Sequence, residues 1–158
     1  MSDGFRIGRR LGIDWGSVRI GVASCDPQGI IATPVTTVPG NARSIDELVA
    51  LVEEYEPIEI VIGLPRSLRG GEGPSAQRIR SHAVSFARAV GDVPVRFVDE
   101  RLTTVSAANV LRASGRSERN QRSVIDQVAA VTILEHALEI ERQTGGPPGP
   151  LVTEEERS

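Results

Sequence analysis

LGIDWGSVRIGVA, residues 11–23, reads as two short apolar strands joined by a tight turn. The apolar runs are Arg10–Ile13 and Ile20–Ser24, and Trp15-Gly16-Ser17 forms the turn between them. Asp14 stands where the first run ends, a place where turn residues and ligand-binding residues both occur. Taken alone, Asp14 is better explained as a residue that shapes the turn.

The segments that follow extend this hairpin into a mixed sheet. A turn at Asp26–Gly29 leads to a third extended segment, Ile30–Val38, which predicts an antiparallel meander. Helical and strand patterns then alternate. Helices are expected at Ser44–Tyr55, Ser75–Val90, Thr104–Ala113 and Val124–Arg142, and strands at Ile58–Gly63 and Val93–Val98. This order predicts an α/β fold with a mixed five-stranded sheet flanked by helices on both faces.

Two of the expected helices carry a capping-box pattern at their start. Ser44 precedes Glu47 by three residues, and Ser123 precedes Asp126 by the same spacing. Asp126 is therefore explained in part as a helix cap. It also lies four residues before Ala130 on an apolar stripe, which favours a position facing the sheet.

Length and composition bound the organisation of the chain. Its 158 residues suit one domain, which we place at residues 1–143, and the Gly- and Pro-rich segment 144–158 is expected to be disordered. No apolar stretch is long enough to cross a membrane and no secretion signal is present, which predicts a cytoplasmic protein. The single cysteine, Cys25, excludes an intramolecular disulfide and leaves an intermolecular one open.

The charged residues exclude some kinds of chemistry and permit a nucleic-acid partner. All 18 basic residues are arginine, which excludes lysine Schiff-base chemistry and the lysine-containing phosphate loop. The net charge is −3, but residues 112–122 carry four arginines and one glutamate. A local basic patch is thus compatible with an acidic whole.

Acidic residues stand at three places that this fold brings toward one region. Asp14 follows the first strand, Asp99 and Glu100 follow the last, and Asp126 begins the last helix. Clustered carboxylates repel one another unless a cation binds between them, and oxygen-only ligands favour Mg²⁺ or Mn²⁺. A pair of such ions supports phosphodiester hydrolysis. The alternative for Asp99 and Glu100 is a surface ion-pair cluster with Arg101.

Six blocks of the sequence, in order, resemble the YqgF/RuvX family of ribonuclease H-like proteins. The blocks are LGIDWGSVRIGVA, ATPVTT, VIGLP, GGEGP, DERLTT and VIDQVAA, and the resemblance runs from Gly8 to Ile140. It implies a ribonuclease H-like fold and a metal-dependent nuclease. The substrate it implies is either Holliday junction DNA or the 5′ end of the precursor of 16S ribosomal RNA.

The resemblance also implies roles for individual residues. Asp14, Glu100 and Asp126 match the family's catalytic and metal-binding acids; Asp99 is the alternative to Glu100, and strand alternation sends these two to opposite faces. Residues expected to contact nucleic acid are Arg19, Arg66, Arg69, Arg101, Thr103 and Arg116. Arg19 is expected either to meet a phosphate or to pair with Asp14.

Other functions remain open at this point. A non-catalytic nucleic-acid-binding module of the same fold is the main alternative, although such a module gains nothing from clustered acids near phosphates. Sugar kinases and actin-like ATPases also use an Asp-x-Gly turn, but they need two such domains. A resolvase that cuts two strands symmetrically would need a homodimer, which a single RNA cut would not. His82 and His136 are expected to be ordinary helix residues and not ligands.

Overall fold

The computed structural model describes residues 5–65, 73–99 and 118–152. Its sheet has five strands in the spatial order β3-β2-β1-β4-β5. β2 pairs antiparallel with both β1 and β3, whereas β4 pairs parallel with both β1 and β5. The strands are β1 (Arg10–Trp15), β2 (Arg19–Cys25), β3 (Ala32–Pro39), β4 (Glu59–Leu64) and β5 (Val95–Asp99). The predicted mixed five-stranded sheet is therefore confirmed.

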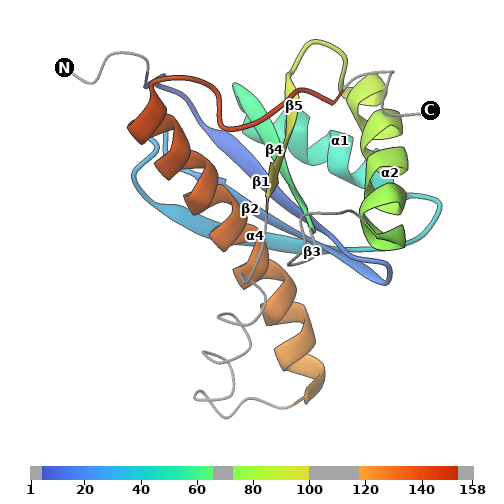
Figure 1. Cartoon of the computed structure of the whole chain (residues 1–158). Helices are drawn as coiled ribbons and strands as arrows, with labels where there is room; N and C mark the ends of the chain where they lie inside the picture. The colour runs from blue at the N-terminus through green and yellow to red at the C-terminus, as the bar shows by residue number, and fades with distance from the viewer. Residues whose placement is uncertain (1–4, 66–72, 100–117, 153–158) are drawn as a thin grey trace.

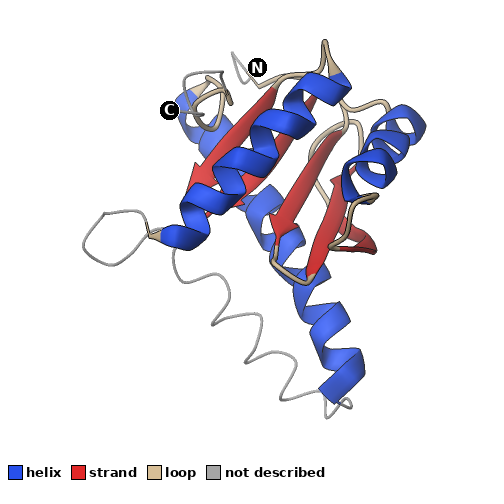
Figure 2. Ribbon diagram, turned by 90° about the vertical axis from the view of Figure 1, so that its right-hand side faces the viewer, coloured by secondary structure: helices blue, strands red, loops and turns tan. Residues whose placement is uncertain are grey.

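Helices cover both faces of this sheet. They are α1 (Ser44–Tyr55), α2 (Pro74–Val90) and α4 (Glu118–Thr144). α4 crosses one face and contacts β1, β2 and β3, whereas α1 and α2 lie on the other face (Figures 1 and 2). The first turns of α4 project beyond the sheet (Figure 1). None of these described helices combines the length and apolar character that crossing a bilayer requires.

Alternate residues of β1 enter two separate cores. Leu11, Ile13 and Trp15 join the apolar cluster beneath α1 and α2. Gly12 and Asp14 fall on the opposite face, toward α4, because successive residues of a strand point to opposite sides. The cluster on the α4 face includes Ala23, Ala130 and other small residues. Their small size lets the helix lie close to the sheet.

Both predicted capping boxes are wrong. The N-cap of α1 is Arg43 without a side-chain cap, and the Ser44 hydroxyl instead accepts a hydrogen bond from the Asn41 amide at 2.8 Å. α4 begins at Glu118, several residues before Ser123, so the Ser123 pattern falls inside the helix. The polar residues before Ser123 have adequate helix propensity to extend it.

The C-terminal segment differs from the disordered tail expected for residues 144–158. Its residues 149–152 lie along β5, where the Phe97 amide donates to the Pro150 carbonyl at 3.0 Å and the Val152 amide donates to the Val95 carbonyl at 2.8 Å. An open sheet edge offers unpaired backbone groups to any segment that reaches it, whatever its composition. Residues 153–158 and the expected helix Thr104–Ala113 lie outside the described residues.

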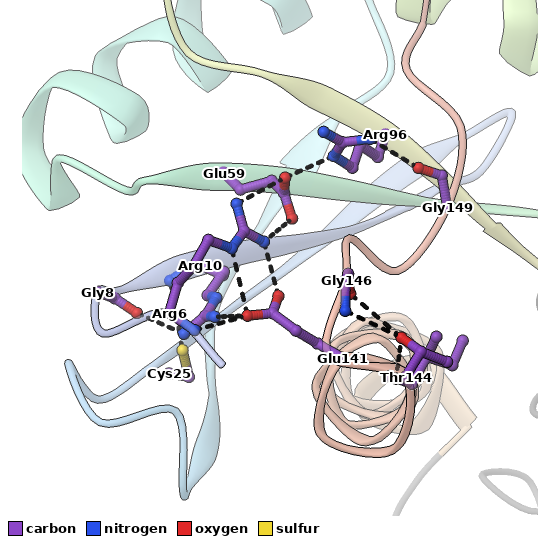
Figure 3. Close-up of polar contacts among 11 residues, drawn as sticks. Arg6, Gly8, Arg10, Cys25, Glu59, Arg96, Glu141, Thr144, Gly146 and Gly149 are labelled. Carbon is purple, nitrogen blue, oxygen red and sulfur yellow. Dashed lines mark hydrogen bonds and ion pairs between the residues drawn. The ribbon is translucent and has the colours of Figure 1, made fainter. Parts of the chain in front are cut away.

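A buried network of ion pairs joins segments from the two ends of the chain (Figure 3). It lies at the end of the sheet where β1 begins. Glu141 of α4 binds Arg6 at 2.6 Å and Arg10 at 2.8 Å. Glu59 of β4 binds Arg6 at 2.9 Å and Arg96 at 2.6 Å. The side chains of Arg10, Glu59 and Glu141 are almost fully buried. The network thus ties the segment before β1 to β4, β5 and α4.

Candidate active site

Asp14 lies near the carboxyl end of β1, on the face that α4 covers. The turn after it is closed by the backbone, since the Gly16 amide donates to the main-chain carbonyl of Asp14 at 3.2 Å. Within the part of the chain that the structure describes, the Asp14 carboxylate accepts no hydrogen bond. Among the described contacts, the carboxylate therefore takes no part in closing the turn.

Asp126 comes near Asp14 because two glycines let α4 approach the sheet. A Cβ atom on Gly21 would lie 2.0 Å from the carbonyl oxygen of Asp126, and one on Gly12 would lie 2.9 Å from that of Ala130. Any side chain at Gly21 would therefore push the helix outward. Gly21 is the β2 partner of Asp14, so this contact places the Asp126 backbone beside Asp14.

The role of these glycines was not predicted from the sequence. The close approach of the helix was attributed to Ala129 and Ala130, which are buried at 2% and 0% exposure. A glycine inside an apolar strand is the signal that points to close backbone approach, and both Gly12 and Gly21 carry it. The contact partner on α4 could not be read from the pattern, because it lies more than 100 residues further along the chain.

Burial raises the pKa of Asp14 to about 6, and the negative charge of Asp126 adds to the shift. At pH 7 most Asp14 side chains are therefore ionised in surroundings that disfavour their charge. Because this folded-state pKa lies above the ordinary value of 3.8, ionisation of Asp14 removes stability as the pH rises through this interval. A cation bound beside the pair would reverse that loss.

Arg19 partly compensates the acidic pair. Its Nε atom lies 2.7 Å from Oδ2 of Asp126, and its side chain is 33% exposed. The predicted pairing of Arg19 with Asp14 is wrong, since its partner in the structure is Asp126. The alternative, a contact between Arg19 and a phosphate, stays a prediction.

Asp99 lies on the other face of the sheet from the acidic pair. Its partner across β4 and β5 is Leu64, a member of the core beneath α1 and α2. Val95 and Phe97, at alternate positions of the same strand, belong to that core too. The alternation of the strand therefore directs Asp99 away from Asp14, which disfavours Asp99 as a metal ligand.

The other predicted site residues lie outside the described residues, and their roles stay predictions. They are Glu100, Arg66, Arg69, Arg101, Thr103 and Arg116. Within the described ranges, no three acidic, histidine or cysteine side chains gather as a metal site. The described residues thus include Asp14 and Asp126, two of the three acidic residues expected at the site.

The Asp14–Asp126 pair has the chemistry of a site for a hard divalent cation. Its donors are carboxylate oxygens, which Mg²⁺ and Mn²⁺ prefer. Burial, and then the charge of Asp126, raises the pKa of Asp14, so its carboxylate is held in surroundings that disfavour the charged form. The residues present therefore fit the ions that sequence analysis expected.

Comparison with known families agrees with this arrangement. Residues 8–140 match the model of RuvX, described as Holliday junction resolvase. The chain belongs to the RuvX family. The resemblance read from the six sequence blocks is thereby confirmed over the same span.

Curated relatives of this RuvX chain carry the name "Putative pre-16S rRNA nuclease". The protein of Streptomyces avermitilis is 60% identical over 148 residues, which cover 92% of this chain and 95% of the relative. That of Streptomyces coelicolor is 60% identical, covering 91% and 87%. That of Nocardioides sp. is 51% identical, covering 94% and 99%. The family description and these names agree on nucleic-acid cleavage, and the chain is accordingly a nuclease.

Solved structures of RuvC from Thermus thermophilus share the fold of this RuvX chain. RuvC in complex with a Holliday junction substrate superposes with a TM-score of 0.54 at 14% identity, covering 89% of this chain and 99% of RuvC. A second RuvC structure gives a TM-score of 0.51 at 14% identity, covering 88% and 99%. The ribonuclease H-like fold predicted from the sequence is thus confirmed.

Proposed function

We propose that this RuvX chain is a metal-dependent endonuclease whose metal-binding and catalytic residues are Asp14, Asp126 and Glu100. The observation that carries the proposal is the pair Asp14–Asp126, held at the end of β1 by the contact between Gly21 and α4. Glu100 completes the set by its match to the family motif. A carboxylate pair that is partly desolvated gains most from binding a cation.

Two Mg²⁺ or Mn²⁺ ions would be held by these carboxylates and, when bound, would stabilise the charge that develops on the scissile phosphate. The chain's own residues position the strand. Arg19 can turn from Asp126 to a phosphate oxygen, since a guanidinium binds either group in the same planar geometry. Further proposed contacts with the strand come from Arg66, Arg69, Arg101, Thr103 and Arg116.

The substrate that we propose first is the 5′ end of precursor 16S ribosomal RNA. It is supported by the shared name of relatives that are 48–60% identical to this chain. Holliday junction DNA is the second candidate, supported by the description of the family. The second would require a two-fold homodimer that cuts symmetrically, and the first would not. Both substrates place the enzyme in the cytoplasm.

Cleavage of the two substrates by the purified protein tests the proposal. We expect Mg²⁺ or Mn²⁺ to support a single defined cut in labelled RNA that spans the 5′ leader and the start of 16S RNA. Chelation with EDTA should abolish this cut, because the carboxylates alone cannot stabilise the phosphate charge.

Each alternative has its own outcome in this experiment. Cleavage of a four-way DNA junction, with the RNA left intact, would assign the second substrate. Tight binding of both nucleic acids without cleavage at any metal concentration would contradict the proposal and favour a non-catalytic binding module.

A further inference from the structure

A hollow of about 380 Å³ lies beside the β1–β2 turn, and the proposed cleavage chemistry does not use it. Its wall is formed by Trp15 at the end of β1 with Gly16 and Ser17 of the turn, Gly40–Ala42 after β3, the start of α1, and Arg78 and His82 of α2. This volume is within the usual range of small-ligand pockets, about 300–1,000 Å³. A second hollow, of about 340 Å³, lies near the other end of α2, and neither Asp14 nor Asp126 lines it.

An aromatic stack forms one side of the hollow beside the β1–β2 turn, which we call the turn hollow. The rings of Trp15 and His82 are 5.5 Å apart between centroids and nearly parallel, at 6°. Phe86 meets the Trp15 indole edge-on at 5.8 Å. Trp15 is only 4% exposed, whereas His82 is exposed. A buried indole thus fixes a solvent-facing imidazole, which is a preorganised surface for stacking a planar group.

The charge of the turn hollow is positive. Arg78 precedes His82 by four residues, which places both on one side of α2. None of the residues that line the hollow is acidic. Within the described ranges, Arg78 forms no ion pair, and it lines the hollow.

The turn hollow and the acidic pair share the β1–β2 turn as a common wall. Trp15 follows Asp14 directly and faces the opposite side of the sheet, while Arg19 begins β2 on the far side of the turn. The turn is held in place by the Gly40 amide, which donates to the Val18 carbonyl at 2.8 Å. A nucleic-acid strand lying at Asp14 therefore has only this turn to cross before it reaches the hollow.

We propose that the turn hollow binds an unpaired nucleotide of the cleaved strand, with its base stacked on His82 and its phosphate facing Arg78. The inference rests on the proposed nuclease function and adds a substrate requirement to it. An aromatic ring beside a cation is the combination that binds single-stranded nucleic acid, because every base has a stacking face and every linkage a charge. A fully paired duplex cannot offer the base.

Fluorescence of Trp15, the single tryptophan, provides a direct test. The full-length protein is titrated in EDTA with a single-stranded RNA octamer and with the same sequence as a blunt duplex. We expect the octamer to change Trp15 emission and the duplex to leave it unchanged. His82→Ala should weaken octamer binding about 5- to 100-fold, the range for lost base stacking. Arg78→Gln should weaken octamer binding too, and should lower its salt dependence, because it removes a phosphate contact.

Three further variants separate binding from structural effects. His82→Phe keeps a stacking ring and should retain the parental affinity to within about threefold. His136→Ala and Arg88→Gln change the same residue types at exposed positions that do not line the turn hollow, and should leave the affinity unchanged. A DNA octamer of the same sequence tells whether the site requires the 2′-hydroxyl.

Failure of this inference can be told from failure of the nuclease proposal. Octamer affinity that is unchanged in both His82→Ala and Arg78→Gln would overturn the nucleotide site, even if cleavage proceeds. Equal binding of duplex and octamer would overturn it too. Octamer binding that depends on His82, in a protein that cleaves no substrate, would support the nucleotide site and contradict only the nuclease.

Discussion

Replacing Asp14 with asparagine is expected to slow RNA cleavage on the order of 1,000-fold and, at the same time, to stabilise the metal-free protein. The loss of activity follows from removing one of the carboxylates proposed to hold the cations. The gain in stability follows from the pKa of Asp14, which burial and the neighbouring Asp126 raise to about 6. Asparagine fills the same space without a charge.

The sign of the stability effect depends on pH in a defined way. The folded-state pKa of Asp14 exceeds its ordinary value of 3.8, so the folded protein binds this proton more tightly than the unfolded chain does. Ionisation therefore removes stability as the pH rises, by up to about 3 kcal/mol once the pH is above the folded-state value. The advantage of Asp14→Asn over the parent should be larger at pH 8 than at pH 5.

Urea unfolding of both proteins in EDTA at these two pH values measures the effect. Asp92→Asn is the matched control, since Asp92 is exposed between α2 and β5, and it should change neither cleavage nor stability by more than about 0.5 kcal/mol. A variant at Asp14 that cleaves at the parental rate, or that is less stable than the parent at pH 8, would contradict the proposed role.

Replacing Glu141 with alanine is expected to lower the free energy of unfolding by about 3–5 kcal/mol. Glu141 is 1% exposed and binds both Arg6 and Arg10, and Arg10 is itself 2% exposed. Without the carboxylate, the Arg10 guanidinium keeps a single described hydrogen bond, to the Gly8 carbonyl, and remains buried with an unpaired charge. Most of the loss comes from this stranded charge.

Thermal unfolding at neutral pH measures this loss, which corresponds to a fall in Tm of roughly 10 °C for a domain of this size. Glu139→Ala is the control on the same helix. Its carboxylate is 55% exposed and lies 3.7 Å from Arg142, so the change should be worth less than about 1 kcal/mol. Equal effects of the two variants would show that the buried network contributes no more than a surface pair.

The buried ion network also makes the stability of the fold depend on pH. Burial alone would raise the pKa of Glu141, but the hydrogen bonds from Arg6 and the charge of Arg10 outweigh burial and hold that pKa below its ordinary value. Stability from this carboxylate is therefore complete at neutral pH and is lost as the pH falls through the acid range. Glu141 and Asp14 thus respond to pH in opposite directions.

The hairpin at residues 11–23 was enough to predict the centre of the sheet, because its two apolar runs and tight turn leave little choice of pairing. The alternating segments after it predicted the parallel strands β4 and β5 by the same local patterns. These predictions hold because periodicity and turn residues act over a few residues.

Contacts between distant residues were the ones that the sequence could not specify. The pairing of Arg19 with Asp126 joins residues 107 positions apart, and both were assigned other partners. The stacking of Trp15 on His82 depends on how α2 packs against β1, which no local pattern encodes. The pairing of residues 149–152 with β5 was hidden by their Gly- and Pro-rich composition, which is typical of disorder.

Calorimetric titration of the metal-free protein with Mn²⁺ at pH 7.5 is the most direct test of the acidic pair as a cation site. The parent should bind Mn²⁺, and Asp14→Asn and Asp126→Asn should each bind it at least about tenfold more weakly. Parental binding should also weaken at pH 5, because the proton competes for Asp14, whose pKa is about 6. Mn²⁺ binding that is the same in the parent and in both variants would contradict the account.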